Sequence, residues 1–198
     1  MKLKIFLLLL SATLVGTGLW LKYEERQEIL AAVEAHKRRW VPYFDLATVS
    51  EVLIKTNTRS LLIKKDGDSW IIQGDTPRKA DITAIGQLVQ RLKNLKPSEE
   101  IEAGPSQYAG FEVLEPDGIS KGTGTLLEIR DKDSRRMAAI IVGKQSFARP
   151  DPKSPFPPPP NGRFFLPAGS TGPIGVVSEG FDSLKTEPDA WAERKESP

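Results

Sequence analysis

The longest uncharged run in the chain lies at its N-terminus and contrasts with every later hydrophobic pattern. Residues 5–21 are mostly apolar and follow Lys2 and Lys4, and about 17 residues is the lower limit for a helix that crosses a bilayer. Such a run is either a signal peptide or a membrane anchor. Its best cleavage site, Gly16-Thr17-Gly18, is followed directly by the large residues Leu19-Trp20-Leu21, which favours the anchor. We predict a membrane anchor (or signal peptide) over residues 1–22.

The charges on either side of this run leave its orientation open. Lys2 and Lys4 favour a cytoplasmic N-terminus, whereas Lys22, Arg26 and residues 37–39 place more cations on the other flank. A long folded domain is translocated largely regardless of such charges. We therefore expect a single-pass protein of the cell inner membrane whose main domain is extracytoplasmic (periplasmic).

The next segment predicts a helix that continues from the anchor. Residues 22–40 contain neither glycine nor proline and are rich in good helix formers, and Pro42 ends the helical pattern. Ile29, Leu30 and Val33 form a narrow apolar stripe. We predict a helical stalk over residues 23–41, which serves either as a solvated spacer or as a docking surface for a partner's helix.

Short aliphatic runs and one helical pattern then predict a sheet and one main helix. Short β-branched and aliphatic runs at 49–55, 60–64 and 70–72 are separated by turn signals, which is typical of an antiparallel meander. From 81 to 95, six apolar residues recur in steps of three and four and predict a helix that covers the sheet. They are Ile82, Ile85, Leu88, Val89, Leu92 and Leu95.

The rest of the chain predicts further short elements. We expect a strand at 99–102, a loop with two buried aromatic residues at 108–111, a hairpin formed by 123–130 and 135–142, and strands at 164–166 and 174–177. A last helical segment from Ser178 to Trp191 follows, which Pro188 interrupts. These elements define an α+β domain over residues 44–192, in which an antiparallel sheet is packed by one amphipathic helix, followed by a tail at 193–198.

A proline-rich loop interrupts this domain at residues 150–160, where seven prolines occur. Such a run favours an extended polyproline II conformation. Two interpretations stay open: a stiff connector that lengthens one hairpin, or a loop that docks in a partner's aromatic groove.

Composition narrows the function classes. The net charge of +2 is too small for an electrostatic nucleic-acid binder, and the absence of cysteine excludes disulfides and cysteine-ligated metal. The single histidine, His36, lies in the predicted stalk, away from the domain. It therefore activates no serine there. We assign no catalytic, cofactor-binding or metal-binding residue and expect no cofactor.

Two acidic groups and one glycine-rich stretch resemble parts of catalytic or binding sites, but each fits a structural role better. Glu99, Glu100 and Glu102 fit a solvated strand edge, and Asp131 and Asp133 fit turn positions. Residues 122–124 (Gly-Thr-Gly) lack the third glycine and the helix of a phosphate loop.

The order of motifs from Phe44 to Trp191 resembles a bacterial family known as domain of unknown function 4340. The motifs that carry the resemblance are Val52-Leu53-Ile54-Lys55, Ser69-Trp70-Ile71-Ile72, Ala80-Asp81, Tyr108-Ala109-Gly110-Phe111, Leu126-Leu127-Glu128-Ile129, Ile140-Ile141-Val142-Gly143-Lys144 and Gly162-Arg163-Phe164-Phe165-Leu166-Pro167. The chain departs from the family in its Tyr-Ala-Gly-Phe motif and its long proline run. The resemblance implies an anchored extracytoplasmic domain encoded near ABC-type transporters of the gliding-motility auxiliary kind, and it supplies no catalytic residue.

Together these observations predict a non-enzymatic, membrane-anchored accessory or structural subunit of a membrane protein complex. The predicted partners are subunits of that complex, with ABC-type transporter subunits as candidates, and the lipid bilayer through the N-terminal helix. The alternative is an envelope module that binds glycan or peptide through exposed aromatic side chains.

Overall fold

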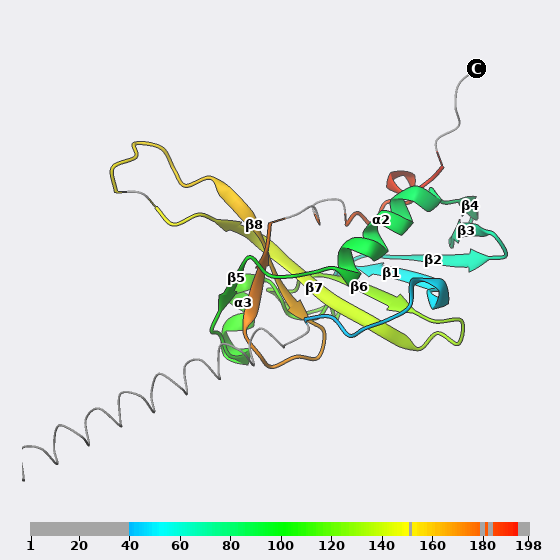
Figure 1. Ribbon diagram of the computed structural model, residues 1–198, viewed down its shortest axis with the longest axis horizontal. Coiled ribbons are helices and arrows are strands. Elements are labelled where there is room, and N and C mark those ends of the chain that lie inside the picture. The colour runs from blue at the N-terminus through cyan, green and yellow to red at the C-terminus, as the bar shows by residue number, and fades with distance from the viewer. Residues whose placement is uncertain (1–39, 151, 179–180, 182–183, 194–198) are drawn as a thin grey trace, which may run out of the picture. The chain divides into compact units, whose positions relative to one another are not determined.

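The computed structural model describes residues 40–150, 152–178, 181 and 184–193 (Figure 1). The predicted anchor (1–22), the predicted stalk up to residue 39, His36 and the tail beyond residue 193 lie outside these residues. No helix among the described residues is long and apolar enough to cross a membrane.

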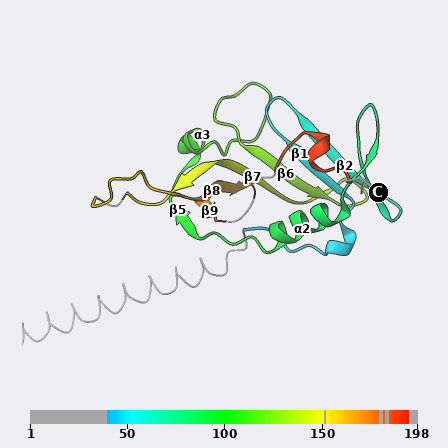
Figure 2. The same ribbon diagram turned by 90° about the horizontal axis from the view of Figure 1, so that it is seen from above.

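An antiparallel sheet dominates the described residues, which makes the domain α+β with mainly β structure (Figures 1 and 2). Nine strands occur there in the order β4-β3-β2-β1-β6-β7-β8-β9-β5. Their bounds are β1 Glu51–Lys55, β2 Ser60–Asp66, β3 Ser69–Ile72, β4 Arg78–Lys79, β5 Glu99–Ile101, β6 Thr125–Arg130, β7 Arg136–Phe147, β8 Pro160–Pro167 and β9 Ile174–Val177. The helices are α2 Ile82–Lys93 and the single turn α3 Tyr108–Phe111, with 3-10 turns η1 Leu46–Thr48, η2 Pro105–Gln107 and η4 Pro188–Ala190.

The predicted meander and the predicted hairpin are confirmed. β1, β2 and β3 pair in sequence, and β6 pairs with β7, all antiparallel. The two further predicted strands, β8 and β9, also pair antiparallel with each other. The acidic strand at 99–101 lies at one edge of the sheet, where Glu99 and Glu100 are exposed. Charged side chains at such an edge discourage pairing with other chains.

Helix α2 begins where the sequence predicts. The Asp81 carboxylate accepts hydrogen bonds from the backbone N–H groups of Thr83 and Ala84, which satisfies two donors of the first turn. Five of the six predicted stripe residues are buried, but Ile82 is 58% exposed. Ile82 is the first residue of the helix and lies at the margin of the stripe, so it does not reach the sheet.

Two hydrophobic clusters cover the two faces of the sheet, and α2 and α3 lie on opposite faces (Figure 2). Adjacent strand residues alternate between them: Leu127, Ile140 and Phe165 face α2, whereas their neighbours Leu126, Ile141 and Phe164 pack with Tyr108 on the other face. Because both faces of the central strands are buried, these strands are almost continuously apolar.

The domain begins earlier than predicted. Trp40 and Val41, which the sequence assigned to the stalk, are each only 7% exposed and belong to the core cluster on the α2 face. The Trp40 and Phe165 ring centroids are 5.0 Å apart. Pro42 does end the helical pattern, but the large apolar residues just before it fill the domain core.

The prediction of a loop at residues 108–111 is wrong. These residues form the helical turn α3, and Phe111 is half-buried whereas Tyr108 is buried. A single turn is too short to show helical periodicity.

The last predicted helical segment, which Pro188 interrupts, lies partly outside the described residues. Those described between 178 and 191 include the 3-10 turn η4 and no α-helix. Proline can begin a turn but cannot continue a helix.

The proline-rich loop lengthens a hairpin, as the first interpretation expected. β7 extends to Phe147 and β8 begins at Pro160, and these two residues pair. We call residues 144–150 and 152–163 the arm; it projects beyond the other strands in both views (Figures 1 and 2).

Candidate functional site

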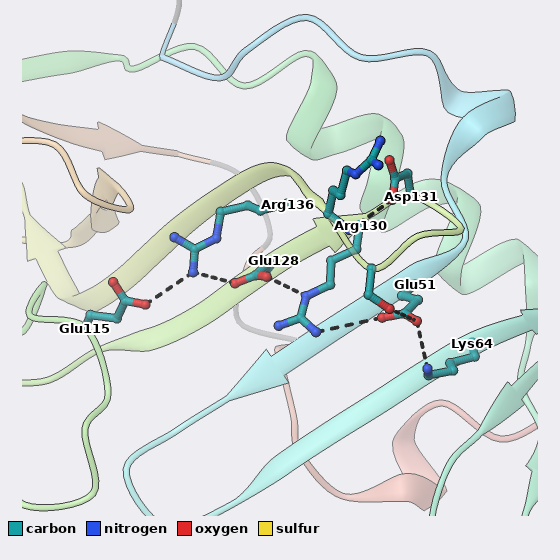
Figure 3. A network of polar contacts seen from close by, with 9 residues as sticks. Glu51, Lys64, Glu115, Glu128, Arg130, Asp131 and Arg136 are labelled. Atoms are coloured by element: carbon teal, nitrogen blue, oxygen red, sulfur yellow. Dashed lines mark hydrogen bonds and ion pairs between the residues drawn. The ribbon is translucent and has the colours of Figure 1, made fainter.

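The main polar feature of the described residues is a charged network on the sheet face opposite α2 (Figure 3). Its six members alternate in charge along the network: Lys64, Glu51, Arg130, Glu128, Arg136 and Glu115. Glu51 pairs in register with Lys64 on β2 and with Arg130 on β6. The strand register therefore brings three of these charges side by side on one face.

A β-bulge places Arg136 on this face. The pairing of β6 with β7 shifts register after Ile129–Ala138, so that Arg130 lies opposite Arg136 and Met137 has no partner. Without the extra residue, Arg136 would point to the α2 face, because side chains alternate along a strand. The bulge thus aims the guanidinium group at Glu128.

Glu128 is the most enclosed charge of the network, with a side chain that is only 4% exposed. Its Oε1 lies 2.5 Å from Nε of Arg130, and its Oε2 lies 2.6 Å from Nη2 of Arg136. Burial raises the pKa of this carboxyl, but hydrogen bonds and charge from Arg136 and Arg130 outweigh burial and hold the pKa below its usual value. The carboxylate is therefore ionised and held on both oxygens.

Glu51 is similarly buried, and one of its oxygens is well satisfied. Oε1 lies 2.8 Å from Nζ of Lys64 and accepts a 2.8 Å hydrogen bond from Oγ of Ser134. Ser134 has φ +58°, in the left-handed region, at the end of a turn capped by the Asp131 carboxylate. Oε2 has only the longer contact with Nη1 of Arg130, at 3.8 Å.

The network is built for ion pairing and not for proton transfer. Burial raises the pKa of Glu51, but hydrogen bonds from Lys64 and Ser134, together with the charges of Lys64 and Arg130, bring the pKa below its usual value. A general acid near neutral pH needs the opposite shift. The hydrogen bond that Arg136 donates to Glu128, helped by the Glu128 charge, in turn raises the pKa of Arg136. The arrangement fixes the register of β2, β1, β6 and β7.

The acidic residues and the Gly-Thr-Gly stretch that the sequence analysis assigned to structural roles lie apart from this network or support its loops. Glu99 contacts Arg149 at 3.9 Å, and Asp133 contacts Arg135 at 3.7 Å, both at the surface. Thr123 forms an isolated bridge with Leu114, and a Cβ on Gly122 would lie 2.5 Å from the Ala109 carbonyl oxygen. The Gly-Thr-Gly stretch therefore allows a close approach to α3.

Metal chemistry has no candidate here: within the part of the chain that the structure describes, no three Asp, Glu or His side chains group as metal ligands.

Asp117 has a pKa lowered to about 2, because its carboxylate accepts hydrogen bonds from the Ser120 hydroxyl and from the backbone N–H groups of Ser120 and Ile119. These bonds close its own surface loop.

Sequence reasoning missed the network. Glu128 lies in the apolar run Leu126-Leu127-Glu128-Ile129, and Glu51 precedes Val52-Leu53-Ile54. A charge within a buried strand is the signal that could have identified them, because such charges persist when they are paired.

No protein-family model, curated protein or solved structure matches this chain. The resemblance to domain of unknown function 4340 therefore stays a prediction.

Proposed function

We propose that this protein is a non-enzymatic accessory or structural subunit of a membrane complex, anchored by its N-terminal segment with the α+β domain outside the cytoplasm. ABC-type transporter subunits are the candidate partners. The observation that carries the proposal is that Glu51 and Glu128 each form ion pairs with basic neighbours. Both buried carboxylates are ionised and stabilise the sheet, so we assign them a structural role and not a catalytic one.

The sequence supports a role for the anchor and stalk in docking, because residues 22–39 carry a dense set of charges beside the predicted membrane segment. Gly16 and Gly18 would allow another membrane helix to approach the anchor closely. We place partner docking in residues 1–39.

The experiment is affinity purification of the full-length chain in gentle detergent, followed by mass spectrometry of the intact complex. We expect a membrane protein at a fixed ratio. A chimera in which an unrelated anchor and helical stalk replace residues 1–39 should lose that partner, and it keeps Trp40 so that the core is intact. A chimera that retains the partner at the same ratio would place docking in the domain.

Two other outcomes would contradict the proposal itself. Saturable binding to isolated cell-wall material, without a membrane partner, would favour the envelope glycan- or peptide-binding alternative. Turnover of a model ester or glycoside by the purified chain would indicate an enzyme.

A further inference from the structure

The arm presents aromatic side chains on a braced hairpin. Phe156 is 77% exposed and Phe147 is 54% exposed, so the arm carries two exposed aromatic side chains. The hairpin is braced at its base by Arg163, whose Nε and Nη2 donate to the Gly143 carbonyl oxygen at 3.0 and 2.9 Å. Nearer the tip, the Ala148 N–H donates to the Pro159 carbonyl oxygen at 2.9 Å. These hydrogen bonds hold the hairpin together between the sheet and its tip, where Phe156 lies.

The tip of the arm carries few backbone N–H donors that would lose a hydrogen bond in an apolar medium. Residues 155–160 contain five prolines and Phe156, and proline has no backbone N–H. The Phe156 N–H donates to Oγ of Ser154 at 3.2 Å, and this hydroxyl lies 3.4 Å from the Phe156 carbonyl oxygen. Every backbone donor in residues 155–160 is therefore absent or satisfied. This lowers the cost of removing the segment from water.

The charge of the arm favours an anionic lipid surface as its partner. Lys144, Arg149 and Lys153 are exposed, and the described residues of the arm include no acidic residue, although the sequence adds Asp151. Arg149 is 95% exposed at its side chain, with only a 3.9 Å contact to Glu99. Proline-rich segments also dock in aromatic-lined protein grooves, and the experiment distinguishes such a partner from a bilayer. Basic flanks beside an aromatic tip match an anionic lipid surface.

We propose that the arm binds the surface of an anionic bilayer, with Phe156 entering the headgroup region and the arm's basic side chains near the lipid phosphates. This contact needs no protein partner, so it does not depend on the subunit role proposed above.

The chain has no cysteine, so one introduced cysteine gives one labelling site. The test places an environment-sensitive fluorophore at Phe156→Cys in the full-length chain, reconstituted in phosphatidylcholine vesicles with or without phosphatidylglycerol. Quenching by spin-labelled lipids reports insertion. The matched control is Ile119→Cys, at a residue that is 90% exposed on another loop. We expect quenching at position 156 that requires phosphatidylglycerol, and little quenching at position 119.

The charge contribution is tested in the labelled Phe156→Cys chain. Arg149→Gln and Lys153→Gln should each lower the ratio of inserted to free arm about fivefold, and added salt should act in the same direction. Three results would overturn the proposal: no quenching at position 156, equal quenching at positions 156 and 119, or shielding of position 156 only when a copurifying protein is present. The last result would identify a protein groove as the partner.

Discussion

Glu128 shows how one residue organises its surroundings. Its two oxygens hold two guanidinium groups, and a bulge is needed to bring one of them into place. The arginine side chains keep partial contact with water, at 27% and 43% exposure for Arg130 and Arg136. The carboxylate is thus buried while its partners are partly exposed. Its removal destabilises the fold mainly because it leaves the two arginines without a counter-ion.

Glu128→Gln keeps the side-chain shape and removes the charge. We expect it to lower the free energy of unfolding by about 1–3 kcal/mol, because two neighbouring arginines lose their common counter-ion. Urea unfolding at pH 7 measures this loss. Glu115→Gln is the matched control, since Glu115 is half-exposed and contacts Arg136 at 3.4 Å; its effect should stay below about 1 kcal/mol. Equal losses in the two variants would contradict the central role of Glu128.

The same carboxylates predict a dependence of stability on pH. The pKa values of folded Glu51 and Glu128 lie below the usual 4.5. In the acid range the folded state therefore binds fewer protons than the unfolded state. Their stabilising contribution is complete above the unfolded pKa and is lost as pH falls through the folded pKa. Urea unfolding between pH 7 and pH 3 should show stability declining below about pH 4.5. Glu128→Gln should flatten that decline, and an unchanged slope would contradict the assignment.

At the scale of elements, α2 separates buried from exposed positions of a single predicted stripe. Leu88→Ala removes a side chain that is 3% exposed and should cost about 2–5 kcal/mol of unfolding free energy. Ile82→Ala changes a residue of the same stripe that is 58% exposed and should cost about 0.5 kcal/mol or less. Thermal and urea unfolding of the two variants compare them directly. A small loss for Leu88→Ala would mean that this face of α2 does not pack on the sheet.

The contact between α3 and β7 depends on a glycine. A Cβ on Gly143 would lie 2.3 Å from the Phe111 carbonyl oxygen, so Gly143→Ala forces backbone to move and should destabilise the domain by about 1–3 kcal/mol. Gly86, within α2, has no neighbour within 4 Å of such a Cβ. Gly86→Ala should therefore stabilise by about 0.5–1 kcal/mol. Opposite signs in chemical denaturation are the expected result, and a loss from both would show that crowding is not the cause.

These elements also show which features the sequence could predict. The stripe of α2 repeats in steps of three and four, and the runs in β1, β2 and β6 are short, rich in β-branched and aliphatic residues and bounded by turn residues, so the type of these elements was predictable. The turn at Tyr108 is too short for any period. The charged network depends on which residue of β7 is bulged, and register is set by long-range packing that no local pattern records. Trp40 was misplaced because helix-forming residues continue up to it.

At the scale of the whole molecule, we expect the stability of the described domain to depend on Trp40, its first residue. Trp40 packs against Phe165 on a central strand, so Trp40→Ala should lower the free energy of unfolding by about 3–5 kcal/mol. The control is Tyr43→Ala, three positions later, where the side chain is 71% exposed; its loss should stay near 0.5 kcal/mol. Calorimetry of both full-length variants measures the difference. Equal losses would place Trp40 in the stalk after all.

The position of β5 has a consequence for the order in which the domain can assemble. β5 precedes β6 along the chain but lies at the sheet edge beside β9, and the Ser98 hydroxyl donates to the carbonyl oxygen of Val176, 78 residues later. As the polypeptide emerges during synthesis, residues 99–101 lack their β9 partner until 174–177 follow. Closing so long a loop is slow. Glu99 and Glu100 keep the unpaired segment hydrated and repel other chains. We therefore expect their charge to limit aggregation of the nascent protein until β9 is available for pairing.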